Sequence, residues 1–110
     1  MEFKVLAEKL GLEEEEFIEL AELFINSGFS DTGILQSAVE RRDFQKAIRS
    51  AHTIKGASGN LGFTDIYEIA KAVEKRLREN SMDGVAEAAE TIKEKIRVLS
   101  EALNERNGDA

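Results

Sequence analysis

The feature of this chain that most limits its fold is a helical spacing of apolar residues that no proline interrupts. Apolar residues recur at intervals of three and four along most of the 110-residue sequence, as in the segment from Phe44 to Leu61, and the chain contains no proline. No segment alternates between apolar and polar residues as a strand would. The sequence therefore predicts an all-α protein, and we expect one domain over residues 1–110, an up-down-up-down antiparallel four-helix bundle with a short extra helix at its N-terminus.

Turn and capping residues divide this pattern into segments. Gly11 is expected to end the first helix, Ser27 to Ser30 to form a turn, and Asp43 and Thr64 to cap the helices that follow them. A connection at Ser81 to Gly84 precedes the last helix. The expected helices cover residues 3–10, 12–26, 31–42, 43–62, 64–80 and 85–106.

The only histidine, His52, lies in the middle of one of these helices. Lys55 follows it by one turn, and Gly56 and Gly59 fall on the same stripe of the helix, beside its apolar face. Each glycine costs about 1 kcal/mol relative to alanine in a helix interior, so their presence suggests room for another molecule to approach. Two plainer interpretations stay open: a lone histidine at this position is most often a surface residue, and small residues also let helices pack closely.

Composition narrows the range of functions. The net charge of −7 argues against nucleic acid and anionic membranes as partners, and the absence of cysteine excludes disulfides and thiol chemistry. The N-terminus lacks the pattern of a signal peptide, and no apolar run is long enough for a membrane span, so we expect a monomeric cytoplasmic protein. Residues 41–80 carry 9 basic and 5 acidic side chains and form the only net-positive third, which suits a histidine that binds phosphate.

The segment His52, Lys55, Gly56, followed by Gly62, resembles the histidine-containing phosphotransfer (HPt) domain of bacterial phosphorelays. It is also similar to the phosphorylated N-terminal domain of chemotaxis histidine kinases, although Lys71 stands where those domains often carry a second histidine. The resemblance implies that His52 accepts a phosphoryl group from a receiver-domain aspartyl phosphate or a histidine kinase and passes it to a response-regulator receiver. It implies a carrier rather than an enzyme, with no bound cofactor and with Mg²⁺ supplied by the receiver.

Glu74 aligns with a position where this family carries glutamine or glutamate. We expect its carboxylate to accept the Nδ1 proton of His52 and leave Nε2 free to attack. Lys55 would supply positive charge to the phosphoryl group, and Gly56 would leave room for the partner. The alternative for Glu74 is a surface ion pair with Arg78, four residues along the same helix.

The expected partner surface surrounds the histidine stripe. We predict an apolar centre and a charged rim, as in transient signalling interfaces, although Phe29 is also suited to closing one end of the core. A different class of function, a helical adaptor that docks receivers or kinases without carrying phosphate, stays open. The residues expected at this surface are Ile25, Phe29, Arg49, Gly59, Lys71 and Arg78.

Overall fold

The computed structural model describes residues 2–108 and contains five α-helices, so the expected all-α class is confirmed. Within these residues no segment forms a strand. No helix of the described range is both long and apolar enough to cross a membrane. The helices are α1 (Phe3–Lys9), α2 (Glu14–Glu40), α3 (Phe44–Leu61), α4 (Thr64–Arg78) and α5 (Val85–Gly108).

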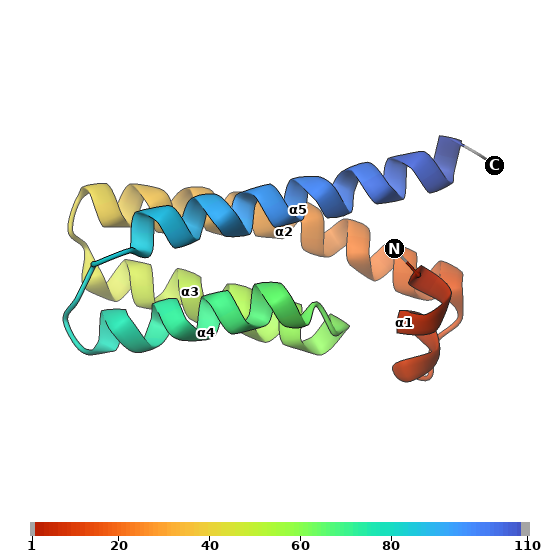
Figure 1. Ribbon diagram of the computed structural model, residues 1–110, viewed down its shortest axis with the longest axis horizontal. Helices are drawn as coiled ribbons and strands as arrows, with labels where there is room; N and C mark the ends of the chain where they lie inside the picture. The colour runs from red at the N-terminus through yellow and green to blue at the C-terminus, as the bar shows by residue number, and fades with distance from the viewer. Residues whose placement is uncertain (1, 109–110) are drawn as a thin grey trace.

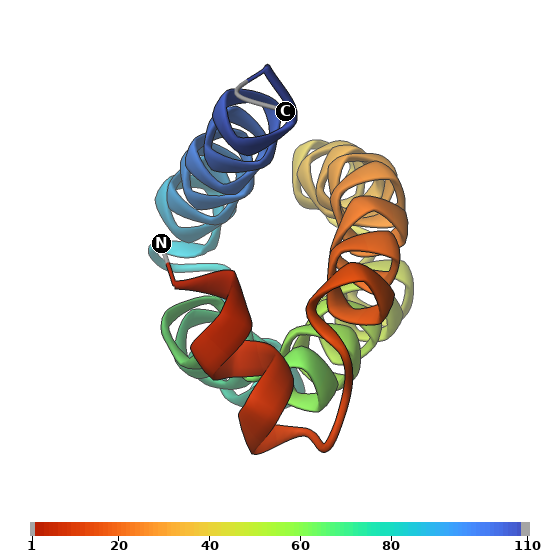
Figure 2. The same cartoon turned by 90° about the vertical axis from the view of Figure 1, so that its right-hand side faces the viewer.

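Four long helices lie side by side along the longest dimension of the molecule, which measures 45 Å (Figure 1). The chain colours in Figure 1 show that each of these helices runs opposite to the one before it. Seen from the end in Figure 2, α2, α3, α4 and α5 follow one another around a common axis, and α1 crosses the end at which α3 meets α4. Helix α3 packs against both α2 and α4, so two neighbouring grooves border the face that carries His52.

Local signals set both ends of α3. The side chain of Asp43 accepts a hydrogen bond from the backbone N–H of Lys46 at 3.0 Å, as expected of a capping residue. Gly62 ends the helix with φ at +79°, a left-handed conformation that glycine adopts without steric cost. The expected cap at Thr64 is wrong: Thr64 is the first residue of α4, and Phe63 precedes it without a side-chain capping bond.

The predicted turn from Ser27 to Ser30 is also wrong, because α2 is one continuous helix. Gly28 lies inside it and faces α5, where a Cβ atom on Gly28 would come within 2.9 Å of Ile96 Cδ1. Glycine at this position therefore lets α2 and Ile96 of α5 approach closely and does not change the direction of the chain. As a result, the two helices expected over residues 12–26 and 31–42 form a single helix of 27 residues.

The core runs the length of the molecule and includes an aromatic cluster that fixes α1. Phe63, between α3 and α4, packs against Phe17 and Phe24 of α2 with ring centroids 5.9 and 5.3 Å apart, and Phe3 of α1 packs on Phe17. Leu20 of α2, by contrast, is 40% exposed. The largest fully buried apolar side chains are Phe17, Leu35, Ile54, Val73, Leu77, Val85, Ile92, Ile96 and Leu99.

Candidate functional site

His52 lies near the middle of α3, on the side facing α4, and its side chain is 63% exposed to solvent. Helices α3 and α4 are joined by a short turn at Gly62 and Phe63 and run antiparallel. Residues at equal distances from this turn therefore face each other across the two helices, and Glu74 of α4 lies opposite His52. The imidazole Nδ1 is 3.1 Å from Glu74 Oε2 and 3.3 Å from Oε1.

Glu74 is the only buried acidic residue among the described side chains, and its side chain is 7% exposed. Burial disfavours the charged form, but hydrogen bonds from Lys55, Arg78 and His52 outweigh it and lower the pKa of Glu74 to about 2. The carboxylate is therefore ionised at neutral pH. Since an ionised carboxylate can only accept hydrogen bonds, Nδ1 of His52 must carry a proton and donate a hydrogen bond to Glu74.

This protonation state determines which ring nitrogen can react. A neutral imidazole with its proton on Nδ1 has an unshared electron pair on Nε2. Among the side chains and backbone groups that the structure describes, none forms a hydrogen bond with Nε2. In the neutral ring the geometry thus presents Nε2 as an exposed nitrogen nucleophile, with the tautomer fixed by a buried carboxylate.

Two cations hold the same carboxylate. Lys55 Nζ lies 2.8 Å from Glu74 Oε1, and Arg78 donates to Oε2 from Nε at 3.0 Å and from its terminal nitrogen at 2.7 Å. Glu74 therefore binds the histidine and forms the ion pair with Arg78 at the same time, so the two expectations for this residue are compatible. With one negative charge on Glu74 and two positive charges on Lys55 and Arg78, the surroundings of His52 have a net positive charge, which favours an incoming phosphoryl group.

The two glycines near His52 have different surroundings. Gly56 is exposed, and a Cβ atom placed on it would meet nothing within 4 Å. Packing inside the protein therefore does not require glycine at this position, which agrees with a role in clearance. At Gly59, a Cβ atom would lie 2.9 Å from Tyr67 Cδ1, so this glycine is needed for the close approach of α3 and α4.

The family model described as the Hpt domain matches residues 19–104, which include α3, α4 and nearly all of α2 and α5. The chain belongs to the Hpt family. No curated protein and no solved structure is significantly similar to it. Hpt domains carry phosphoryl groups in two-component signalling and interact with receiver domains and histidine kinases, so this chain has a phosphotransfer role in such a system.

The residues predicted to bind the partner fall on two sides of the Hpt domain. Arg49 and Lys71 are exposed on α3 and α4, the two helices that form the site, and the ammonium of Lys71 lies 5.9 Å from the centre of the Tyr67 ring. Ile25 is only 7% exposed and borders a groove between α2 and α5, so it offers little surface to a partner. Phe29 is 37% exposed one turn further along the same side of α2. These two residues therefore lie away from the α3–α4 groove that holds His52.

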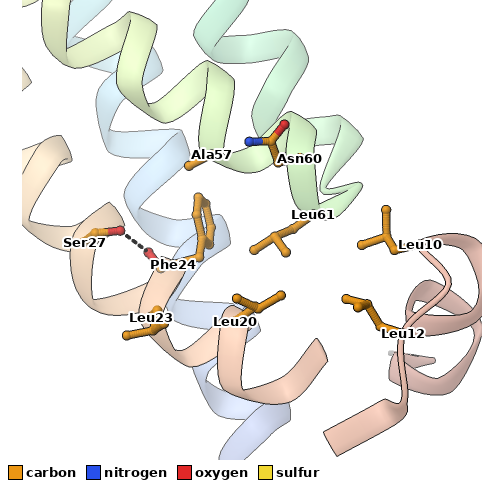
Figure 3. A pocket seen from close by; sticks show the side chains of 9 residues that line it. All are labelled: Leu10, Leu12, Leu20, Leu23, Phe24, Ser27, Ala57, Asn60 and Leu61. Atoms are coloured by element: carbon orange, nitrogen blue, oxygen red, sulfur yellow. Dashed lines mark hydrogen bonds between the residues drawn. The ribbon is translucent and has the colours of Figure 1, made fainter. Parts of the chain in front are cut away.

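A larger apolar surface, which the sequence analysis did not identify, lies on the other side of α2. Figure 3 shows its side chains around an open groove between the α1–α2 connection, α2 and α3. Leu23 is 65% exposed, and Leu10 and Leu20 are 39% and 40% exposed. The sequence contains a signal for this surface, because Leu23 does not fall on the face of α2 that Phe17, Ala21 and Phe24 bury. The groove is lined by Leu10, Leu12, Leu20, Leu23, Phe24, Ser27, Ala57, Asn60 and Leu61.

No group of three or more metal-binding side chains occurs in the described part of the Hpt domain. The one acidic residue at the site, Glu74, already has three hydrogen-bond partners. Its carboxylate oxygens are therefore already engaged by Lys55, Arg78 and His52.

Proposed function

We propose that this Hpt domain is a phosphohistidine carrier in a phosphorelay. His52 accepts the phosphoryl group of a receiver-domain aspartyl phosphate, or of a histidine kinase, and passes it to a response-regulator receiver. The observation that carries this proposal is the exposed imidazole of His52 with its Nδ1 proton held by the buried Glu74. The proposal includes a single, monomeric, cytoplasmic domain with the topology of an up-down-up-down antiparallel four-helix bundle.

The transfer step follows from the tautomer. Nε2 of His52 attacks the phosphorus atom of the aspartyl phosphate, the P–N bond forms, and the P–O bond to the donor carboxylate breaks. The donor leaves as a carboxylate, and the imidazole, which keeps its Nδ1 proton, gains a formal positive charge. Glu74 stabilises this charge through the hydrogen bond to Nδ1. Transfer to the next receiver is the reverse of this step, so no proton has to be moved in either direction.

Lys55 and Gly56 assist the reaction at His52, Lys55 by its positive charge and Gly56 by the space that it leaves. Lys55 follows His52 by one turn, so its flexible ammonium group can reach the oxygens of a phosphoryl group on Nε2. Gly56 leaves open space on the exposed side of the helix, through which the receiver can bring its aspartate in line with Nε2. In this proposal the receiver supplies the Mg²⁺ that neutralises the phosphoryl oxygens, and the Hpt domain contributes none.

The apolar groove beside α2 is the part of the surface best suited to hold the receiver. Ala57 and Asn60 follow His52 on α3 by about 7 and 12 Å of helix rise. A weak signalling interface of about 600 Å² per partner extends roughly 14 Å from its centre, so an interface centred on His52 reaches this groove. We therefore propose that Leu20 and Leu23 form an apolar part of the docking surface at one edge of the interface, and that Arg49 and Lys71 belong to its charged rim.

The experiment that tests the carrier function uses a panel of phosphorylated receivers with wild-type protein and the His52→Gln variant. We expect at least one receiver to label the wild type with phosphate that is lost in acid and stable in base, as a phosphoramidate bond is. His52→Gln is expected to fold, bind the receiver and remain unlabelled.

The alternative function, a helical adaptor without phosphate, predicts a different result. In that case receivers bind wild type and His52→Gln equally, and neither protein becomes labelled. Label that persists in His52→Gln, or that resists acid, would contradict His52 as the phosphorylated residue.

A further inference from the structure

Arg78 was expected at the rim of the partner surface, but its guanidinium is engaged inside the site. Both of its hydrogen bonds go to Glu74 Oε2, from Nε at 3.0 Å and from the terminal nitrogen at 2.7 Å. The two residues are four positions apart on α4, so the contact forms within one helix and does not depend on a partner.

The cations around Glu74 divide its two oxygens between them. Arg78 donates to Oε2, and His52 Nδ1 is also closer to Oε2 than to Oε1. Lys55 Nζ contacts Oε1. Lys55 can therefore leave the carboxylate without breaking the bonds at Oε2. Its side chain is also the more flexible of the two, since a lysine ammonium rotates on a long stem while a guanidinium is a planar fork.

We infer that Arg78 is a positioning residue of the phosphotransfer site, which keeps Glu74 in place and neutralised so that Lys55 is free to move from Glu74 to the phosphoryl group on His52. The inference rests on the proposed carrier function and adds a step to it. In the unphosphorylated protein, the ammonium of Lys55 is paired with Glu74. After phosphorylation, the same ammonium is needed at the phosphoryl oxygens.

The charges explain why a second cation is required. When a phosphoryl group with two negative charges is attached to Nε2, Lys55 is attracted to two anions at once. Without Arg78, Lys55 would be the only cation within hydrogen-bonding distance of a carboxylate whose side chain is 7% exposed. Arg78 supplies that charge permanently, so binding of Lys55 to the phosphoryl oxygens does not leave Glu74 as an unpaired buried anion.

The test compares two phosphoryl donors. One is a receiver that labels His52, and the other is phosphoramidate, a small molecule that has no docking surface and releases ammonia as it transfers its phosphoryl group. We expect Arg78→Met to slow labelling about threefold to tenfold with both donors, without changing the receiver concentration needed for half-maximal rate. Lys55→Met is expected to slow both at least as much, and the double variant to be no slower than Lys55→Met alone. Arg78→Lys is expected to recover most of the rate.

Lys75→Met is the matched control, because Lys75 is an exposed cation next to Glu74 in sequence with no ion pair among the described residues. It removes the same charge and leaves the carboxylate's contacts intact. Thermal melting of each variant, followed by circular dichroism, separates slow transfer from loss of fold.

Three results would overturn the inference. A slower reaction with the receiver alone, or a higher half-maximal concentration of receiver at unchanged maximal rate, would return Arg78 to the partner surface. Equal rates for Arg78→Met and wild type would remove it from the site, and additive losses in the double variant would show that it acts independently of Lys55. If phosphoramidate labels His52 and no receiver does, the carrier function fails while the role of Arg78 is still decided.

Discussion

Replacing Glu74 by glutamine is expected to remove a defined part of the pH dependence of folding. Glutamine keeps the size of the side chain and can still accept the Nδ1 proton of His52, but it loses the charge that holds Lys55 and Arg78. The fall in the pKa of Glu74 from 4.5 to about 2 corresponds to about 3 kcal/mol of stability. Because Arg78 is 59% exposed, solvent screening reduces this figure, and we expect a loss of about 1 to 2 kcal/mol at pH 7.

The direction of the pH effect follows from the depressed pKa. The stabilisation is complete above pH 4.5, where the carboxylate is ionised in both folded and unfolded chains, and it is lost as the pH falls toward 2. Urea unfolding at a series of pH values from 7 to 3 measures the free energy of unfolding of wild type and Glu74→Gln. We expect the two curves to converge as the pH falls below 4.5.

Glu68→Gln is the control for this experiment, since Glu68 is an exposed carboxylate on the same helix. Its curve is expected to stay parallel to that of the wild type. If Glu74→Gln is as stable as wild type at pH 7, or if the difference between them is the same at pH 7 and pH 3, the ionised Glu74 carboxylate does not stabilise the folded state.

Three further predictions concern the surface around His52. Gly56→Leu is expected to raise the melting temperature, because leucine favours helix by roughly 1 kcal/mol and its Cβ atom would meet nothing within 4 Å, and to block labelling by receivers; an active variant would contradict the clearance role. Gly59→Ala is expected to lower the melting temperature despite alanine's better helix propensity, because its Cβ would lie 2.9 Å from the Tyr67 ring, and the added change Tyr67→Ala is expected to relieve that loss; a higher melting temperature for Gly59→Ala alone would show that the ring moves aside freely. Arg49→Glu and Lys71→Glu are expected to slow association with the acidic receiver site, most at low salt, with melting temperature unchanged; stopped-flow rates that are equal for all three proteins at every salt concentration would remove both residues from the rim.

Both ends of α3, which depend on neighbouring residues, could be predicted from the sequence, although the local prediction of a cap at Thr64 was wrong. The continuity of α2, which depends on a distant residue, could not be predicted. Asp43 begins α3 through a bond to a backbone group three residues away, and Gly62 ends it through its own left-handed backbone conformation. Gly28 was mistaken for a turn because the reason for it, Ile96, lies on α5 and is not evident from residues 20–40. From the neighbouring residues alone, a glycine that allows close packing inside a helix cannot be told from a glycine that forms a turn between two helices.

The candidate site shows the same limit. The spacing of His52 and Lys55 on one helix placed them together, and the resemblance to the Hpt family indicated Glu74. The contacts of Arg78 could not be assigned in advance, since a cation four residues from a glutamate can pair with it or extend into solvent at similar free energy. The Glu74 side chain is only 7% exposed, and this burial favours the ion pair with Arg78 over an Arg78 that extends into solvent. The burial in turn depends on how α3 and α4 pack.

The groups that react and the groups proposed to choose the partner belong to different parts of the chain. His52, Lys55, Glu74 and Arg78 all lie on the α3–α4 hairpin, while most of the apolar groove comes from α2 and the connection that precedes it. Substitutions such as those at Leu23 would therefore alter which receiver is recognised and leave the phosphoryl chemistry intact. If such a domain were duplicated in a cell with several phosphorelays, changes in α2 alone could give the copies different partners. Crosstalk between the pathways would then depend on residues of α2 and not on those around the histidine.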